Sequence, residues 1–483
     1  MEQQRYAAVI GGRRVESGAW FDVIDPATGK AFAQAARCGA GEVDAAVAAA
    51  REASEAGWRV SEAADRATLL RALSAAILAD SEPLARLESQ DAGKPLAQAR
   101  ADVKVAARYF SFYASVVETL RGDTIPVRSG AFAYSVREPF GVTAHITPWN
   151  YPIQIASRTL APALAAGNCC VLKPAEEAPL TAIRLAELAL DAGFPAGVLN
   201  VVPGFGIEAG AALSAHPGID HLAFTGSRPI GTLIAREAAN NIVPVTLELG
   251  GKSPNIVFPD ADLDAAFPAI VNAIIQNAGQ TCSAGSRLLV HASLYERLIE
   301  QIGEAFEGLR LGCGLDDPAI GPLISQKQRD RVAALVDAAG REARLVTGGS
   351  DVITGDLADG FFFRPTLFAD VLADATIWRE EVFGPVLAAA SFRDEDDAVR
   401  LANSTDYGMI SAVWTQDISR AHRLIPKLRS AQVYVNSYGA GGGVELPFGG
   451  YKRSGYGREK GVEGLIEYSQ LKTVLINHTT GQR

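Results

Sequence analysis

The stretch "GVTAHITPWNYPIQIASRTLAPALAAGNCCVLK", residues 141–173, decides the fold class of the chain. It begins with a short apolar run at 141–147 and continues through 153–166, where apolar residues recur with helical spacing. It closes with a second apolar run at 169–173. An apolar strand, a helix and another apolar strand in succession are typical of an α/β protein with a parallel sheet.

The same alternation continues to residue 249. We expect further strands at 198–202, 221–225 and 243–249, with helices between them at 179–192, 206–214 and 230–239. Five strands separated by helices predict a doubly wound parallel sheet, which binds ligands at the carboxyl ends of its strands. Five short segments lie at or just after those ends: "TPWN" (147–150), "KPAE" (173–176), "PGFG" (203–206), "FTGS" (224–227) and "ELGG" (248–251).

The rest of the chain divides around this region. Residues 42–58 and 62–119 predict amphipathic helices, the second broken at 93–95, and 130–138 alternates like a strand. A second α/β series runs from 254 to about 435, followed by a Gly-rich tail and a strand-like end at 468–477. Because an apolar strand at a chain terminus needs a partner edge, we expect it to pair with another subunit.

Length and charge limit the function classes. A chain of 483 residues exceeds one core, so two or three domains are expected. The net charge of -10, without a block of Lys or Arg, argues against nucleic acid or an anionic membrane as partner. The start has no signal-like segment and no window is long enough to span a bilayer, so we expect a cytoplasmic protein.

The cysteines point to chemistry at one position. Five cysteines at irregular spacing, without CxxC pairs or nearby His, argue against a disulfide scaffold and a metal site. Cys169 and Cys170 fall inside a predicted buried strand and are interpreted as core. Cys282, in "NAGQTCSAGSRLLV" (277–290), stands among small and polar residues where a substrate can reach it. Its alternative is a loop cysteine without a role.

Two further polar residues occupy unusual places. Glu248 ends an apolar strand, where burial of a carboxylate is costly unless it is used or paired. It can serve as a general base toward water, or it can be a helix cap or an exposed strand end. Asn150 lies between two prolines that hold the backbone extended. Its amide suits an oxyanion, and the alternative is a turn asparagine.

Candidate nucleotide contacts follow the second, third and fourth strands. Lys173 and Glu176 can hydrogen-bond ribose hydroxyls. The segments 203–210 and 224–231 place glycines before helices whose N-termini suit phosphate. Neither matches the G-x-G-x-x-G fingerprint after a first strand, so glycine spacing alone does not identify a nucleotide site.

Taken together and in this order, the motifs resemble the aldehyde dehydrogenase superfamily over nearly the whole chain. They are "TPWNYP", "KPAEEAP", "NVVPGFG", "AFTGS", "LELGGKS", "GQTCSAGSRL", "EEVFGPV" and "PFGGYKRSGYGRE". The resemblance implies a Rossmann-like doubly wound cofactor domain, an α/β catalytic domain and a small β oligomerisation flap. It assigns 1–120 and 141–249 to NAD binding, 250–440 to catalysis, and 121–140 with 462–483 to oligomerisation, and we expect a homodimer or homotetramer.

The resemblance also implies roles for single residues. Cys282 is the nucleophile, Asn150 with the backbone amide of Cys282 forms the oxyanion hole, Glu248 activates water and Glu459 relays its proton. The residues implied to contact NAD, or NADP as the alternative cofactor, are Ile146, Thr147, Pro148, Trp149, Lys173, Glu176, Gly206, Gly210, Phe224, Thr225, Gly226, Ser227, Leu249, Gly250, Glu381 and Phe383. After "FTGS" the chain departs from the family pattern, because Arg228 and Pro229 follow instead of a small or polar residue and an acid.

The implied reaction oxidises a small aldehyde to the acid through a thioester on Cys282. The alternatives are a CoA-acylating enzyme, which needs no hydrolytic base, and a non-catalytic member, which is expected to lack at least one of the three central residues. Arg158, if helical, lies near the Asn150 face and about 12 Å along, close to a tunnel mouth. There it pairs with a substrate carboxylate or is a solvated surface residue. The "GAGGG" at 439–443 is expected near the same mouth.

Overall fold

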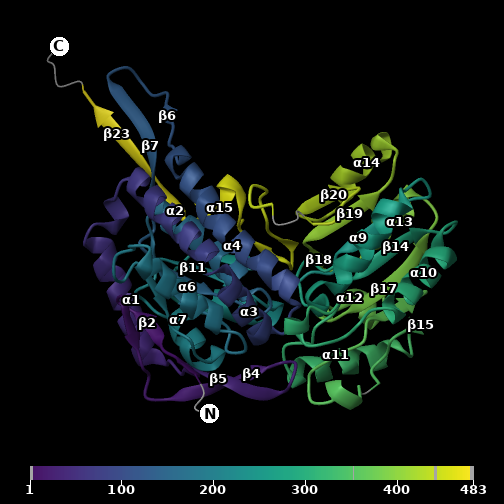
Figure 1. Ribbon diagram of the computed structural model, residues 1–483. Helices are drawn as coiled ribbons and strands as arrows, with labels where there is room; N and C mark the ends of the chain where they lie inside the picture. Colours follow the sequence, from purple (N-terminus) through teal and green to yellow (C-terminus); the bar gives the residue numbers. More distant parts are fainter. Residues whose placement is uncertain (1–3, 352, 440–442, 479–483) are drawn as a thin grey trace.

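The computed structural model describes residues 4–351, 353–439 and 443–478. Figure 1 shows two lobes side by side and a β-ribbon that projects away from the first lobe. The first lobe is drawn in purple to teal and the second mainly in green. In the described residues, no helix combines the length and the apolar character needed to cross a lipid bilayer.

An eight-stranded sheet forms the centre of the first lobe, in the order β22-β12-β11-β8-β9-β10-β2-β3. Its five middle strands are parallel, which confirms the predicted doubly wound sheet. They are β8 (Val142–Ile146), β9 (Cys169–Lys173), β10 (Leu199–Val201), β11 (His221–Thr225) and β12 (Val245–Glu248). The antiparallel edge strands β2 (Ala8–Ile10), β3 (Arg13–Val15) and β22 (Gly455–Tyr456) were not predicted.

Helices cover this sheet. The set comprises α1 (Ala40–Glu55), α2 (Ala63–Ala79), α3 (Ser81–Ala92), α4 (Leu96–Val116), α5 (Pro152–Ala166), α6 (Leu180–Asp191), α7 (Ala211–Ser214) and α8 (Arg228–Asn240). The predicted helical block at 62–119 breaks at Asp80 as well as at 93–95. Within 206–214, a π-helical turn at Gly206–Gly210 precedes α7. Helix α5 lies between the sheet and the layer of α2 and α4, so it is buried almost throughout.

The strand order places two loops side by side. From β8 the chain crosses through α5 to β9 on one side, and from β11 it crosses through α8 to β12 on the other. Strands β8 and β11 are themselves neighbours, with Ile146 opposite Phe224. The segments after these strands, 147–150 and 225–227, therefore flank the point where the winding reverses, and such points are where open α/β sheets bind ligands.

The second lobe contains a seven-stranded sheet in the order β15-β16-β17-β14-β13-β19-β20. Its strands are β13 (Pro254–Val257), β14 (Arg287–His291), β15 (Arg344–Thr347), β16 (Thr366–Ala369), β17 (Val386–Phe392), β19 (Ile410–Trp414) and β20 (Gln432–Val435). Around it lie α9 (Leu263–Ile275), α10 (Tyr295–Glu307), α11 (Gln326–Ala339), α12 (Thr376–Arg379), α13 (Glu395–Ala402) and α14 (Ile418–Leu424). Cys282 lies in the connection from α9 to β14, at the amino end of this sheet.

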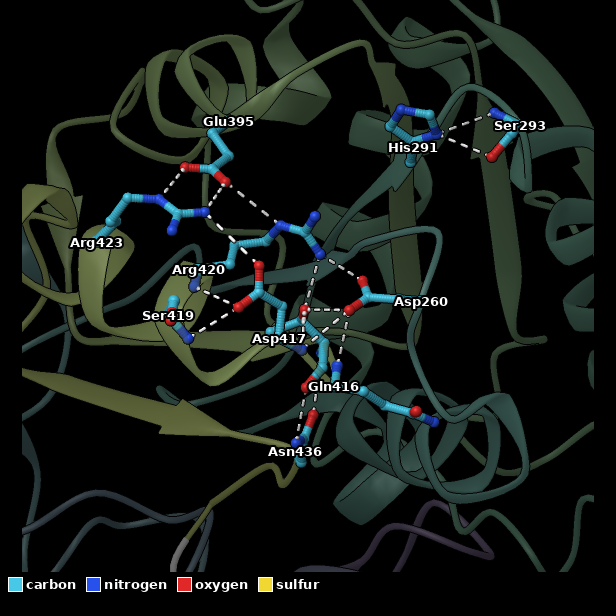
Figure 2. A network of polar contacts seen from close by, with 11 residues as sticks. Asp260, His291, Ser293, Glu395, Gln416, Asp417, Ser419, Arg420, Arg423 and Asn436 are labelled. Carbon is cyan, nitrogen blue, oxygen red and sulfur yellow. Dashed lines mark hydrogen bonds and ion pairs between the residues drawn. The ribbon is translucent and has the colours of Figure 1, made fainter.

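A polar network joins elements at the opposite, carboxyl end of that sheet (Figure 2). Asp260, after β13, accepts hydrogen bonds from the Thr415 hydroxyl at 2.8 Å and from the backbone N–H groups of 416 and 417 at 3.0 Å each. It also pairs with Arg420 at 2.5 Å. Arg420 contacts Glu395 at the start of α13 at 3.4 Å. The network thus ties the ends of β13 and β19 to α13 and α14, away from Cys282.

Three smaller sheets complete the fold in the described residues, and the smallest pairs β18 (Tyr407–Gly408) with β21 (Tyr451–Lys452). In the projecting ribbon, β7 (Ala131–Pro139) pairs with β23 (Ser469–Asn477) along its whole length, and β6 (Thr124–Ile125) adds a short third strand (Figure 1). Near the N-terminus, β1 (Gln4–Tyr6), β5 (Lys30–Ala36) and β4 (Trp20–Asp25) form another sheet. Its turn reaches the second lobe, where the Phe361 N–H donates to the Pro26 carbonyl at 2.9 Å.

Candidate active site

A cavity of about 450 Å³ opens at the carboxyl end of the first sheet, and both lobes line it. From the first lobe come the loops after β8, β11 and β12, and from the second come Cys282 and the segment around 380–383. The predicted site residues that line it are Pro148, Trp149, Asn150, Thr225, Gly226, Ser227, Glu248, Leu249, Gly250, Cys282, Glu381 and Phe383. Three strand ends of the first lobe therefore meet several segments of the second lobe, among them the loop of Cys282.

The loop that carries Cys282 is held from several sides. Asn277 has a left-handed backbone, with φ of 48°, and its side-chain amide donates to the Asn150 carbonyl at 2.8 Å. The Gln280 side chain donates to the Asn277 carbonyl at 3.1 Å. Gly251 lies so close that a Cβ there would be 2.2 Å from the Cys282 carbonyl oxygen. These three supporting residues were not predicted from the sequence, since only the Asn and Gly identities hint at tight backbone geometry.

Asn150 presents its amide at the cavity wall. Its side chain is 3 % exposed, and Nδ2 donates one hydrogen bond to the Gln280 carbonyl at 2.9 Å. A primary amide carries two N–H hydrogens, so one remains for a ligand oxygen. The geometry fits an oxyanion donor held in a fixed orientation.

Cys282 separates the cavity from an apolar surface. The thiol packs against Met409, Ile410 and Phe448, with Tyr434 and Tyr438 at the edge of the same cluster. We call these five residues the apolar wall; none of them lines the 450 Å³ cavity. Burial raises the pKa of the Cys282 thiol to about 12, with the Arg158 guanidinium acting in the opposite direction. The thiol is thus reachable from the cavity and bordered by apolar surface on its other side.

Two buried carboxylates, Glu248 and Glu459, lie close to each other, and Glu248 lines the cavity together with Cys282. Glu248 is 1 % exposed at the end of β12, and in the described part of the chain neither of its carboxylate oxygens has a hydrogen-bond partner. Burial, followed by the charge of Glu459, raises the pKa of Glu248 well above its ordinary value. Glu459 is equally buried and forms an ion pair with Arg158. The neighbouring carboxylate therefore adds to the proton affinity that burial gives Glu248.

The surface alternative for Arg158 is wrong, because its side chain is only 4 % exposed, while its role toward a substrate carboxylate stays a prediction. Its side chain is buried because α2 and α4 cover the side of α5 that the sheet leaves free. The guanidinium pairs with Glu459, donates to the Thr225 hydroxyl at 3.3 Å and lies 5.0 Å from the centroid of the Phe448 ring. Of the "GAGGG" expected at the mouth, residues 440–442 lie outside the described residues.

The predicted ribose contacts lie beside the cavity. Lys173 ends β9 and pairs with Glu176 at 2.8 Å, and Glu176 accepts a hydrogen bond from the Gly206 N–H at 3.4 Å. Burial acts to raise the pKa of Glu176, but the Lys173 ammonium outweighs it and the pKa is lowered. Ile146, Thr147, Gly210 and Phe224 do not line the cavity; Ile146 and Phe224 are buried ends of β8 and β11, and the Thr147 N–H donates to the Lys173 carbonyl at 3.1 Å.

The start of α8 faces the same cavity. Ser227 caps the helix, and residues 225–229 are part of the cavity lining. A helix N-terminus exposes N–H groups and a partial positive charge, and Arg228 adds a full one. The departure from the family pattern at Arg228 and Pro229 therefore leaves the terminus suited to an anion, since proline fits a first helical turn.

Glu381 and Phe383 close the cavity from the second lobe. Glu381 accepts a hydrogen bond from the Gly251 N–H at 2.9 Å, and burial raises the pKa of its carboxyl to about 7. The rings of Phe383 and Trp149 meet edge to face at 5.3 Å. In the described residues, no cluster of three or more His, Cys, Asp and Glu side chains that could hold a metal ion is found.

Comparison with known proteins gives one consistent family. Residues 14–474 match the model of the aldehyde dehydrogenase family. The hydroxyisobutyraldehyde dehydrogenase of Mycolicibacterium austroafricanum is 43% identical over 462 residues, covering 95% of this chain and 91% of that protein. Betaine aldehyde dehydrogenase of Staphylococcus aureus, solved in complex with NAD+, is similar with a TM-score of 0.96 at 38% identity, covering 99% and 96% of the two chains. A mutant aldehyde dehydrogenase of Bacillus cereus has the same TM-score at 40% identity, with 99% and 97% covered.

Proposed function

The chain belongs to the aldehyde dehydrogenase family, and we propose that it oxidises a small aldehyde to the carboxylic acid with NAD as hydride acceptor. One observation carries the proposal. Asn150, Glu248 and Cys282, from three separate segments and both lobes, line one end of the same cavity. They supply an oxyanion donor, a base and a nucleophile, the groups that oxidation through a covalent thioester requires.

A dinucleotide would occupy the cavity and the surface beside it. Lys173 and Glu176 would hold the adenosine ribose, the start of α8 would take the pyrophosphate, and Glu381 with Phe383 would border the nicotinamide half. When bound, NAD supplies the acceptor for the hydride that leaves the substrate carbon. The S. aureus relative in complex with NAD+ supports this choice, and NADP is the alternative cofactor.

The protein's own groups carry the first step. The Cys282 thiol gives its proton to solvent water and the thiolate sulfur adds to the aldehyde carbon, so the carbonyl oxygen becomes an oxyanion. The free N–H of the Asn150 amide and the backbone N–H of Cys282 stabilise that oxyanion; loss of one such donor typically raises the barrier by about 3 kcal/mol. Once the hydride has left, the acyl group remains on Cys282 as a thioester.

Glu248 serves the second step. It takes a proton from water, the resulting hydroxide attacks the thioester, and the acid leaves while the Cys282 sulfur is regenerated. The raised pKa of Glu248 makes it a stronger base than an ordinary carboxylate. Glu459, buried close by and paired with Arg158, is placed to pass the proton onward.

A hydrolytic base argues against the CoA-acylating alternative, in which a thiol accepts the acyl group. The presence of all three central residues argues against a non-catalytic member.

We also propose that 1–120 and 141–249 bind the cofactor, that 250–440 carry the nucleophile, and that 121–140 with 462–483 join subunits into a homodimer or homotetramer. The five free cysteines suit a reducing compartment, and we place the protein in the cytoplasm.

The test separates the two chemical steps. Cys282→Ala should abolish both the first-turnover burst of reduced cofactor and steady turnover with a panel of aldehydes. Glu248→Gln should keep the burst and lose most steady turnover, because acylation precedes the step it serves. Cys313→Ala is the matched thiol control, since Cys313 is also half-buried in a loop but lies outside the cavity. A Cys282→Ala protein that still oxidised aldehydes would refute the proposal.

A further inference from the structure

Lys460 has a backbone conformation that lysine rarely adopts. Its φ is 60° and its ψ is 176°, in a region that is accessible almost only to glycine. The residue directly follows Glu459 and precedes α15 (Gly461–Glu467). Such a conformation typically costs about 1 to 3 kcal/mol and persists where the surroundings impose it, often at functional sites. A lysine side chain is therefore held here at a cost that glycine would avoid.

The ammonium of Lys460 lies over an aromatic ring of the apolar wall. Its Nζ is 5.0 Å from the centroid of the Phe448 ring. The position of that ring is fixed, because the backbones of Phe448 and Glu459 exchange hydrogen bonds of 2.7 and 2.8 Å. Phe448 belongs to the cluster against which Cys282 packs, and neither Phe448 nor Lys460 lines the 450 Å³ cavity. The ammonium is thus on the side of the thiol away from the cofactor cavity, where the substrate chain must lie.

In the described residues the ammonium of Lys460 has no direct ion-pair partner, although the carboxylates of Glu459 and Glu248 lie near enough for their charges to act on it. Arg158 also lies 5.0 Å from the Phe448 ring, but its charge is compensated by Glu459. Glu445, another acid near Lys460, pairs with Arg108 at 2.5 Å. In the described part of the chain, the Lys460 ammonium forms no ion pair or hydrogen bond, and the side chain is only half-buried. One positive charge at the apolar wall is therefore without a direct partner, on a side chain that is partly exposed.

We propose that Lys460 binds an anionic group at the far end of the aldehyde, so that the preferred substrates are short aldehydes carrying a carboxylate. The proposal rests on the proposed oxidation and names its substrate class. Burial, helped by Arg158 and opposed by Cys282, Glu459 and Glu248, lowers the pKa of Lys460 to about 8, so the ammonium is mostly charged at neutral pH. A partly desolvated ammonium beside an aromatic ring gives a carboxylate a strong partner, whereas a cationic aldehyde is repelled.

The experiment compares three aldehydes of different charge on the full-length protein: succinic semialdehyde, butanal and betaine aldehyde. In the wild type, kcat/KM should be highest for succinic semialdehyde. Lys460→Met should lower it for succinic semialdehyde about tenfold, change it less than about twofold for butanal and raise it for betaine aldehyde. Lys460→Arg should restore most of the preference, and Lys472→Met, on the projecting ribbon, is the control for loss of a remote charge.

The pH dependence gives a second readout. The ratio of kcat/KM for succinic semialdehyde over butanal should fall in the wild type as the pH rises through about 8, because the ammonium is then lost. The ratio should stay flat in Lys460→Met. Equal losses for the charged and neutral aldehydes in Lys460→Met would show that Lys460 acts on the Cys282 thiol or on folding, and would overturn the proposal. Failure of the wild type to oxidise any of the three would instead refute the proposed function itself, and this proposal with it.

Discussion

Glu248 and Glu459 are two buried carboxylates whose charges interact, and among the described residues Glu459 has a cationic partner whereas Glu248 has none. The sequence pointed to Glu248 because a carboxylate at the end of a buried strand is costly unless it is used. The pairing of Glu459 with Arg158 was not foreseen. Helix α5 is buried at nearly every position, but Ser157, Arg158 and Thr159 are polar neighbours in its sequence, so the pattern alone did not exclude a solvated Arg158. The acid that pairs with Arg158 comes from a segment some 300 residues later in the chain. No local sequence pattern predicts that this segment packs against α5.

The first prediction concerns the pH dependence of thioester hydrolysis. Glu248 acts as a base only when ionised, so the rate should rise with pH through a value well above the ordinary glutamate pKa of about 4.3. The Glu459 charge is one cause of that raised pKa, so Glu459→Gln should move the rise to lower pH. Measurement of the steady-state rate against pH, in a variant series with Glu467→Gln as control, tests this. An unchanged profile in Glu459→Gln would mean that the two carboxylates do not interact.

The second prediction concerns the choice of cofactor. Glu176, held by Lys173 at 2.8 Å, is placed to accept a hydrogen bond from the ribose 2′-hydroxyl and to repel a 2′-phosphate. We expect kcat/KM to be higher with NAD than with NADP. Glu176→Gln should bring the two values closer by removing the repulsion and leaving Lys173 free to meet the phosphate. A wild type that uses NADP as well as NAD would show that Glu176 does not contact the 2′ position.

At the scale of elements, strands buried on both faces were the most predictable. The five parallel strands read as continuous apolar runs, and all five lie within about two residues of the predicted positions. The edge strands β2, β3 and β22 have two or three residues each, too few for a pattern to emerge. The order of the strands in the sheet also could not be predicted, because it depends on the direction in which each connecting helix carries the chain across the sheet.

The third prediction concerns the network of Figure 2, which links four element ends through Asp260. Burial raises the pKa of Asp260, but hydrogen bonds from Thr415 and the backbone, with the charge of Arg420, outweigh it, and the net pKa is lowered. A carboxyl whose pKa is lower in the folded state stabilises the fold above its unfolded pKa of about 3.9, and this contribution is lost as the pH falls through the folded value.

Asp260→Ala should therefore lower the free energy of unfolding by about 2 kcal/mol at pH 7. The difference from the wild type should shrink as the pH falls below about 4, because the wild-type carboxyl is then protonated as well. Urea denaturation at several pH values measures both effects. Because the network lies at the end of the sheet away from Cys282, kcat should be unchanged at temperatures where the variant is folded. A variant as stable as the wild type would show that the network is redundant.

At the scale of the molecule, the cavity forms because the carboxyl end of the first sheet faces the amino end of the second sheet. The carboxyl end of the first sheet brings Asn150 and Glu248, and the amino end of the second brings Cys282. The apolar runs of each lobe predict the sheet of that lobe. They do not predict how the two lobes are placed against each other. The β1–β5–β4 sheet helps to hold the lobes together by contacting the second lobe. The Gly-rich tail does so by running back to the first lobe with Phe448, Glu459 and Lys460.

The last prediction concerns assembly through the projecting ribbon. Strand β23 is nine residues long, and in the described residues it has β7 on one edge only. Leu471 and Leu475, at 59 % and 56 % exposed, point to the same face because side chains alternate along a strand. A long edge with exposed apolar side chains invites a partner strand or surface. We therefore expect a homodimer or homotetramer by light scattering at micromolar concentration. Leu471→Glu combined with Leu475→Glu should dissociate it, whereas Gln470→Glu, on the other face of the strand, should not. A monomeric wild type, or a double variant that kept its mass, would exclude this face as the interface.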